Sequence, residues 1–356
     1  MKENTKTIFR VIIFILIFTI CFLYVQEILR VKLELSDNLF FAYDDALEDQ
    51  ADGLETDVIF LGSSPMYAGI TPIVMWDEAG ITALNIAATN GTAMGHYYLL
   101  CDVLERVDTK MVVLDFQDLC DERYLSGKWI PGYDRRFYTI KSLPVRWRFL
   151  KDMLSTSDEM SLTDYLFPIG EGHGRWPFIE EMDFTHESSE YRDYFRGALM
   201  YTEQEKLDGF PEYKPDTSPD QIKEFSADYY RNIIKMCSEK GIKVLGVQVP
   251  LGLDKTSEVL ARKEFCRQQG IEYIDLNEPE FAEKIGSDCK TDFYNRGHQN
   301  LLGSVKTSRF LAQYLTAEYD IPDHRADPLY DRWNEMYRDF TEDYDTVLAE
   351  LEKGAA

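Results

Sequence analysis

Short apolar runs alternate along the chain with longer segments that mix apolar and polar residues. Five runs consist mostly of apolar residues and end at small or polar ones. These runs cover residues 57–61, 83–86, 111–114, 243–249 and 272–276. Continuous apolar runs of this length are typical of strands that are buried on both faces, as in a parallel sheet. The pattern therefore predicts five buried strands.

The segments between these runs predict helices. Residues 93–106, 257–269 and 303–319 are expected to be helical, and apolar residues recur at helical spacing from 222 to 237. The sequence Ser-Pro-Asp-Gln at 218–221 has the residues of a capping box, so we expect the helix over 222–237 to begin there. Strands that alternate with helices predict an α/β fold, with a doubly wound five-stranded parallel sheet.

Two segments depart from this alternation. Residues 121–217 carry many aromatic and turn-forming residues but no series of strands, and we interpret them as a partly helical insertion between the third and fourth strands. The segment 321–356 is rich in acidic and aromatic residues, which predicts an acidic helical tail. The expected domain therefore spans residues 31–320, after an N-terminal segment of residues 1–30.

The N-terminal segment has the features of a membrane anchor. Val11 to Val25 contains no charged residue, and Lys2, Lys6 and Arg10 precede it. With its apolar flanks the run reaches the length of about 20 residues that spans a bilayer. The following residues, Gln-Glu-Ile-Leu-Arg, offer no site for a signal peptidase, which argues against a cleaved signal peptide. We expect a single-pass protein of the cell membrane, with a cytoplasmic N-terminus and most of the chain extracytoplasmic.

Composition narrows the classes of function. The chain has 63 acidic and 38 basic residues, a net charge of −25, which argues against nucleic-acid binding. Five cysteines outside the apolar run are scattered without a CxxC pair, and the five histidines form no HExxH motif. We therefore expect neither a dense disulfide framework nor a zinc site.

Polar residues follow several of the predicted strands. They are Ser63, Ser64, Asn90, Gly91, Asp115, Gln117, Asp292, Asn295 and His298. In open α/β sheets, ligands bind beyond the carboxyl ends of the strands, so we expect these residues to share one rim. A serine becomes a nucleophile when a base lies within hydrogen-bond reach and when donors face the developing oxyanion. This rim offers both kinds of group.

Four stretches carry a resemblance to a known family. They are VIFLGSSPMYAGITP, NIAATNG, MVVLDFQDL and DFYNRGHQNLLGSVKTSRFLAQYL. In this order and spacing they resemble the SGNH (GDSL-type) hydrolase superfamily, in particular its membrane-anchored DltD-like and alginate-acetylation-like branches of bacterial cell-envelope proteins. The resemblance covers about residues 57–118 and 240–316. It implies a flavodoxin-like SGNH fold that carries out acyl transfer or ester hydrolysis.

The resemblance also implies substrates and partners. The acyl groups would belong to a cell-surface polysaccharide or a teichoic-acid-like polymer, and a membrane-bound O-acyltransferase would be a partner. It implies no metal and no organic cofactor.

The resemblance assigns roles to individual residues. Ser64 matches the nucleophile, with Ser63 as the alternative, and His298 matches the general base. An oxyanion donor falls at Asn90 or Gly91.

Two positions differ from the family pattern. The family's third-block asparagine is absent, and Gln117 is the nearest side-chain donor. The family also has an aspartate three residues before its histidine, where this chain has Asn295. Three possibilities follow: Asp292 replaces it, a Ser-His dyad works alone, or the site is not catalytic.

Simpler interpretations stand beside these. Serine is a common helix-capping residue, so Ser63 or Ser64 can simply cap the following helix. Asp115 and Gln117 can be ordinary polar residues at a strand end. Asn300 is expected to cap the helix that follows it. Because of Asn295, the alternative function is a catalytically degenerate accessory protein of an envelope polysaccharide acylation system.

Overall fold

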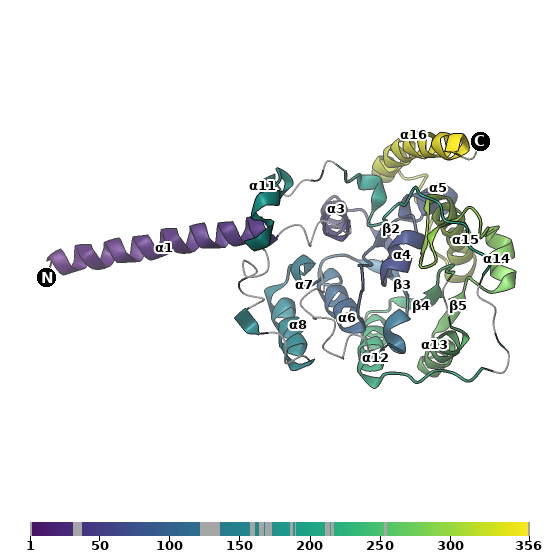
Figure 1. Ribbon diagram of the computed structural model, residues 1–356, viewed down its shortest axis with the longest axis horizontal. Coiled ribbons are helices and arrows are strands. Elements are labelled where there is room, and N and C mark those ends of the chain that lie inside the picture. The colour runs from purple at the N-terminus through teal and green to yellow at the C-terminus, as the bar shows by residue number, and fades with distance from the viewer. Residues whose placement is uncertain are drawn as a thin grey trace.

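The five predicted strands form one parallel sheet. In the computed structural model the strands are β1 (Thr56–Leu61), β2 (Ala83–Asn85), β3 (Thr109–Leu114), β4 (Lys243–Gln248) and β5 (Glu272–Asp275). They lie in the order β2-β1-β3-β4-β5, and every neighbouring pair is parallel (Figure 1). The prediction of an α/β fold with a five-stranded parallel sheet is confirmed. The strand order reverses between β1 and β3, so the switch point where such sheets bind ligands lies there.

The structure describes residues 2–30, 38–121, 136–156, 161–163, 167, 173–185, 188, 190–210, 214, 217–252 and 255–354. The predicted insertion over 121–217 therefore falls partly outside the described residues, and its status as an insertion stays a prediction. Its described helical elements include α7 (Arg136–Thr139), α8 (Leu143–Thr156), η3 (His173–Phe178), α11 (Met182–Thr185) and η4 (Asp193–Phe195).

Alternate residues of the strands supply two apolar cores. Val58 and Phe60 of β1 face one core, whereas Ile59 and Leu61 face the other, as the period of two requires. The first core is covered by α4 (Ser64–Gly69), α5 (Pro72–Ala79), α14 (Pro279–Ile285) and α15 (Leu301–Tyr319). The second is covered by α3 (Leu39–Ala51), α6 (Ala93–Val103), α12 (Glu224–Glu239) and α13 (Thr256–Gln269). Helices on both faces make this sheet doubly wound.

The capping-box prediction at 218–221 is wrong, because α12 begins only at Glu224. The N–H of Asp220 donates to the carbonyl of Ser257 at 2.8 Å, and the N–H of Lys223 donates to that of Leu119 at 2.9 Å. These tertiary hydrogen bonds hold the segment in a non-helical conformation. The cap predicted for α15 is confirmed, since the Asn300 side chain accepts from the N–H of Gly303 at 3.2 Å.

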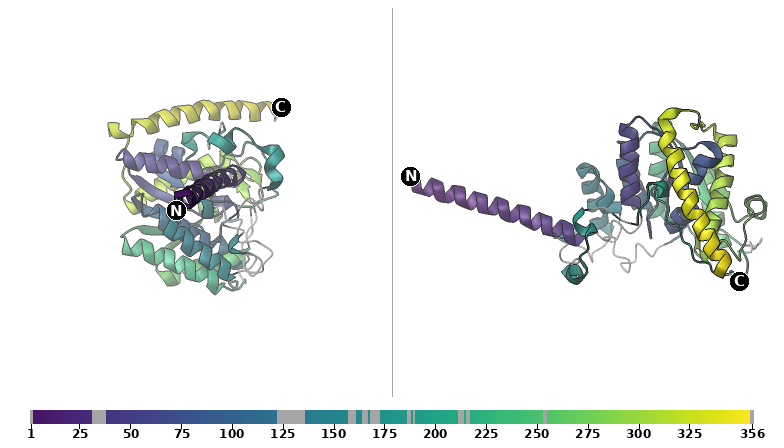
Figure 2. Two further views of the ribbon diagram at one scale, coloured as in Figure 1. Left: turned by 90° about the vertical axis from the view of Figure 1, so that its left-hand side faces the viewer. Right: turned by 90° about the horizontal axis from the view of Figure 1, so that it is seen from above.

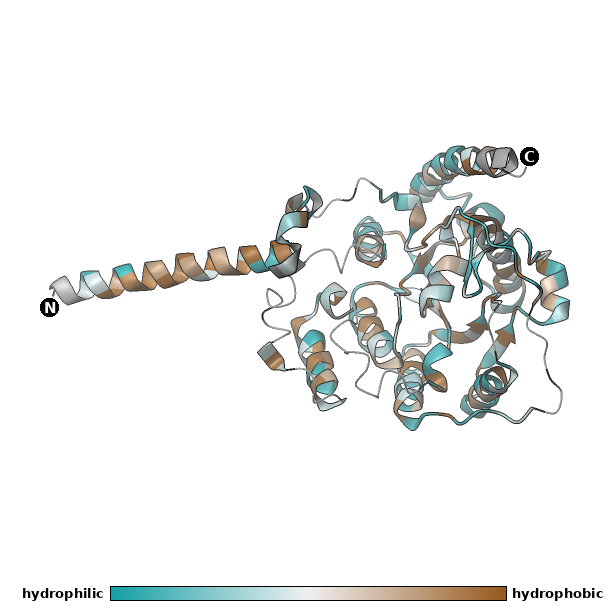
Figure 3. Ribbon diagram, in the orientation of Figure 1, coloured by the Kyte–Doolittle hydropathy of each residue, from teal (hydrophilic) through white to brown (hydrophobic). Residues whose placement is uncertain are grey.

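The chain begins with one long helix, α1 (Lys2–Arg30). Its stretch Thr5–Leu29, 25 residues, is long and apolar enough to cross a membrane. Figure 2 shows α1 standing away from the rest of the chain, and Figure 3 shows apolar residues along most of its length. Only its last turn is buried, at Gln26, Ile28 and Leu29. The predicted apolar N-terminal helix is therefore present.

The chain ends with another long helix, α16 (Asp331–Gly354), which follows the short turn η5 (Pro328–Tyr330). Trp333, Met336 and Phe340 pack from its inner face against α5 and η4. The helix expected in the acidic C-terminal segment is thus amphipathic and rests on the domain.

Candidate active site

The turn after β1 presents Ser64 at the switch point of the sheet. Ser63 and Ser64 follow the carboxyl end of β1, and Pro65 in the first turn of α4 favours the start of a helix there. Ser63 occupies the cap position, but its side chain makes no capping hydrogen bond. The capping interpretation of Ser63 therefore does not hold.

A short hairpin brings His298 to Ser64. Its strands are β6 (Phe293–Asn295) and β7 (His298–Gln299), which pair antiparallel just before α15. The Nε2 atom of His298 lies 2.8 Å from the Oγ atom of Ser64. The structure thus brings together the two residues expected as nucleophile and base, 234 positions apart in the chain.

Asn295 fixes the tautomer of His298. Its Oδ1 atom accepts from the backbone N–H of Gly297 at 2.8 Å and lies 2.9 Å from Nδ1 of His298. A backbone N–H can only donate, so this atom is the amide oxygen and Nδ1 carries the ring proton. The Nε2 atom is then left with a lone pair that can accept the Ser64 hydroxyl proton.

Burial keeps the His298 ring neutral. It lowers the pKa of His298 below its ordinary value of 6.5, because desolvation disfavours the charged imidazolium. Asn295 orients the ring but carries no charge that would raise the pKa again. His298 is therefore a neutral acceptor near pH 7 and a weaker base than one that is paired with a carboxylate.

Asp292 does not replace the missing aspartate. Its buried carboxylate accepts from the Lys306 ammonium at 2.8 Å on each oxygen, from the Thr291 hydroxyl at 2.7 Å and from the Asp288 N–H at 2.8 Å. The His298 ring instead contacts Asn295. The role considered for Asp292 is corrected: it supports the loop in front of the hairpin.

Ser63 and Asp115 form a second pair below Ser64. One oxygen of the buried Asp115 accepts from the N–H of Ser63 at 2.7 Å and from its hydroxyl at 3.0 Å. Burial raises the pKa of Asp115, although these hydrogen bonds oppose the effect. A Cβ atom on Gly62 would lie 2.3 Å from this oxygen, so a larger residue there would displace the Asp115 carboxylate. Because the Ser63 hydroxyl is already bound to Asp115, Ser64 is the better candidate for a nucleophile.

Gln117 belongs to a neighbouring polar cluster. Its Nε2 lies 3.4 Å from Oε1 of Gln248, which also accepts from Arg262 at 2.8 Å. Gln248 and Arg262 are almost fully buried. Gln117 is thus held at the ends of β3 and β4, next to the Ser63–Asp115 pair rather than in contact with Ser64.

The two residues expected to stabilise an oxyanion differ in availability. The N–H of Gly91 donates to the carbonyl of Ala88 at 3.1 Å and so closes a turn. Asn90 sits in that turn with a left-handed backbone, φ of 53°, and its side chain is exposed. A further donor is the backbone N–H of Ser64 itself, because the first N–H groups of a helix have no partner within it. The N–H of Gly91 is thus already used within the turn, which does not fit the expected role of an oxyanion donor.

Two tyrosines next to His298 were not predicted. The rings of Tyr201 and Tyr294 stack at a centroid distance of 4.1 Å, and the Tyr201 ring lies 5.8 Å from that of His298. Tyr201 comes from the predicted insertion, which continues along the hairpin: the N–H of Glu205 donates to the carbonyl of Phe293 at 2.8 Å. Nothing in the sequence around Tyr201 indicates this position.

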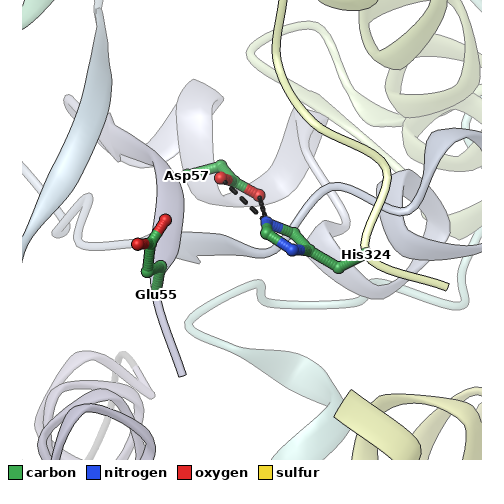
Figure 4. A group of neighbouring side chains, drawn as sticks. All are labelled: Glu55, Asp57 and His324. Carbon is green, nitrogen blue, oxygen red and sulfur yellow. Dashed lines mark hydrogen bonds and ion pairs between the residues drawn. The ribbon is translucent and has the colours of Figure 1, made fainter. Parts of the chain in front are cut away.

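A cluster at the other end of β1 has ligand atoms of the kind that bind metals. Glu55, Asp57 and His324 lie close together (Figure 4), with Nε2 of His324 3.0 Å from an oxygen of Asp57. The ammonium of Lys110 contacts both carboxylates and lies 2.7 Å from Asp57. Because a cation already neutralises these acids, we interpret the cluster as an ion-pair network that ties the C-terminal segment to the sheet.

The chain matches no model of a known protein family, and no curated protein matches it. The candidate site therefore stands on its own geometry.

Proposed function

We propose that this chain is a membrane-anchored serine esterase or O-acyltransferase of the SGNH type. The observation that carries the proposal is the contact of 2.8 Å between Ser64 Oγ and His298 Nε2, with the ring oriented by Asn295. The arrangement of nucleophile, base and orienting residue is the one that acyl transfer requires. Its place at the switch point of a doubly wound sheet supports a ligand site there.

The proposed reaction has two halves. The Ser64 oxygen attacks the acyl carbonyl of an ester while His298 takes its proton, and the backbone N–H of Ser64 faces the oxyanion. His298 then protonates the departing alcohol, which leaves an acyl group on Ser64. A water molecule or a hydroxyl of the acceptor attacks this acyl group and gives its proton to His298. His298 passes this proton to the departing Ser64 oxygen, which restores the serine hydroxyl and the neutral ring. With a hydroxyl acceptor the sum is transfer of an ester, and with water it is hydrolysis.

The substrate and location are also part of the proposal. The α1 helix would cross the cell membrane with its N-terminus in the cytoplasm, so that the site faces the envelope. The acyl groups would belong to a cell-surface polysaccharide or a teichoic-acid-like polymer, and a membrane-bound O-acyltransferase would supply them. The support is the apolar 25-residue stretch of α1 and the resemblance of the strand-end motifs.

The alternative is an accessory protein whose site no longer reacts. The uncharged Asn295 favours it, since a carboxylate at that position would stabilise the imidazolium that forms during attack. The intact contact between Ser64 and His298 favours the enzyme.

Labelling with a fluorophosphonate separates the two functions. We expect the full-length chain in detergent to form a covalent adduct on Ser64, located by peptide mass analysis, because the neutral His298 activates this hydroxyl. The Ser64→Ala variant should form none, and the matched Ser63→Ala variant should keep it. A folded wild-type protein that forms no adduct would support the accessory function, and an adduct on Ser63 would contradict the assignment of the nucleophile.

The labelling rate should depend on the protonation of His298. Only the neutral ring accepts a proton, so the rate should fall as the pH drops through a midpoint below the ordinary 6.5. Asn295→Asp adds a carboxylate that favours the imidazolium. It should therefore move this midpoint upward by at least about 1 pH unit and speed labelling at pH 8 by about tenfold. An unchanged midpoint in this variant would mean that another group is the base.

A further inference from the structure

Exposed apolar side chains gather where α1 meets the rest of the chain. Outside α1, the large apolar residues that are exposed among the described residues lie between positions 143 and 184, Leu329 apart. We call six of them the aromatic collar: Leu143, Trp147, Phe167, Trp176, Phe178 and Phe184. Trp176 and Phe178 are 68% and 66% exposed, which is costly in water unless something covers them.

The collar is continuous with the end of α1. The helix α1 contacts η3 and α11, which carry Trp176, Phe178 and Phe184, and the ring of Phe22 lies 5.9 Å from that of Phe167. Figures 1 and 2 place α8 and α11 on the side from which α1 projects. The elements that carry the collar therefore lie on the side from which α1 leaves the folded part.

The burial of α1 determines where the collar lies relative to the membrane. Val25 and the apolar residues before it are exposed, apart from the half-buried Phe22, whereas Gln26, Ile28 and Leu29 are buried against the folded part. No free spacer separates the apolar stretch of α1 from η3 and α11. If the apolar stretch lies in a bilayer, the collar must then lie at the surface of that bilayer.

The outer face of α8 has the chemistry of a membrane surface. Its inner face, with Val145, Phe149 and Met153, is buried in the core, while Trp147, Arg148 and Lys151 are exposed. Neither Arg148 nor Lys151 makes an ion pair with a described residue. Tryptophan beside exposed basic residues is typical of helices that lie at the lipid headgroups. This local basic face stands out in a chain of net charge −25.

We propose that the aromatic collar inserts into the lipid headgroup region of the membrane that α1 crosses, so that the domain rests on the bilayer. The inference relies on the anchor of the proposed function. It adds a second contact with the membrane, which restricts the tilt of the domain on its single helix.

Tryptophan quenching by brominated lipid tests the collar. The full-length chain is assembled into nanodiscs of phosphatidylcholine and phosphatidylglycerol, with or without bromine on the upper part of the acyl chains. We expect bromine to reduce the fluorescence of the wild-type protein, and to reduce that of Trp147→Phe/Trp176→Phe proportionally less. The buried Trp333, replaced in the matched variant Trp333→Phe, should not contribute to the quenching.

The charges of α8 provide a second arm. Arg148→Glu/Lys151→Glu should reduce the quenching, whereas Lys235→Glu, an exposed charge reversal on α12, should not. Equal fractional quenching of wild type and Trp147→Phe/Trp176→Phe in discs would overturn the proposal that the collar inserts into the membrane. A second protein that covers the collar in place of lipid would overturn it as well. A chain that fails to enter the discs would instead contradict the anchor.

Discussion

Replacing His298 with alanine should slow the reaction of Ser64 with a fluorophosphonate or an ester by about 10²–10⁴-fold, the usual contribution of a general base. The reason is geometric: the ring nitrogen at 2.8 Å is the acceptor for the Ser64 proton, and its tautomer is fixed by Asn295. The measurement is the rate of adduct formation at pH 8, followed over time by mass spectrometry of the intact chain.

A second histidine offers the matched control. His324 also contacts an acceptor, Asp57 at 3.0 Å, but it lies at the opposite end of β1 from Ser64. His324→Ala should therefore leave the rate unchanged. Labelling of His298→Ala at the wild-type rate, with its fold intact by circular dichroism, would contradict the role of the base. Equal slowing in both variants would point to a loss of folding.

Replacing Gly197 with alanine should lower the free energy of unfolding by about 2–5 kcal/mol, the sum of a left-handed backbone and a steric overlap. Gly197 has a φ of +91°, and a Cβ atom there would lie 1.8 Å from the carbonyl oxygen of Asn85. That oxygen belongs to the backbone of β2. The N–H of Asn85 donates to the carbonyl of Arg196 at 2.9 Å, so moving Asn85 away from Gly197 would also break this hydrogen bond. The overlap can be relieved only by moving β2 or the segment that carries Tyr201.

Gly241 separates backbone strain from the overlap. It also has a positive φ, +73°, but a Cβ atom there meets nothing within 4 Å. Gly241→Ala should cost only about 1–2 kcal/mol, the strain of a left-handed residue. Urea titration of both variants in detergent, followed by tryptophan fluorescence, measures the difference. Equal losses of unfolding free energy in the two variants would mean that the overlap with Asn85 does not contribute to the destabilisation.

The sheet could be predicted from the sequence because its strands are buried on both faces. Each strand is then a continuous apolar run such as the one in β1, and the turn after it is marked by the small residues Gly62 and Ser63. The hairpin of β6 and β7 could not be predicted in this way. Its strands have three and two residues, and they are partly polar.

The candidate site was predictable in its residues but not in its contacts. Ser64 follows the carboxyl end of β1, and His298 was expected on the same rim through the loop after β5, because ligands bind beyond the carboxyl ends of such strands. Their roles as nucleophile and base came from the family resemblance. The choice between Asn295 and Asp292 depended on where Lys306 lies, one turn into α15, and no spacing indicates that. Tyr201 reaches the site through tertiary packing alone. The start of α12 was misplaced for the same reason, because its capping residues bind other elements.

The pairing of β3 with β4 has a consequence for how the chain acquires its reactivity. Met111 pairs with Lys243, and the elements α7, α8 and α12 lie between them in sequence. Closing so long a loop before any contact stabilises it makes folding slow, as it is for other sheets with distant partners. The 234 positions between Ser64 and His298 add to this, since β1 is complete long before the hairpin that carries the base has been synthesised. Reactivity of Ser64 should therefore appear only at the end of folding, so the rate at which labelling becomes possible reports the last step of folding of this chain.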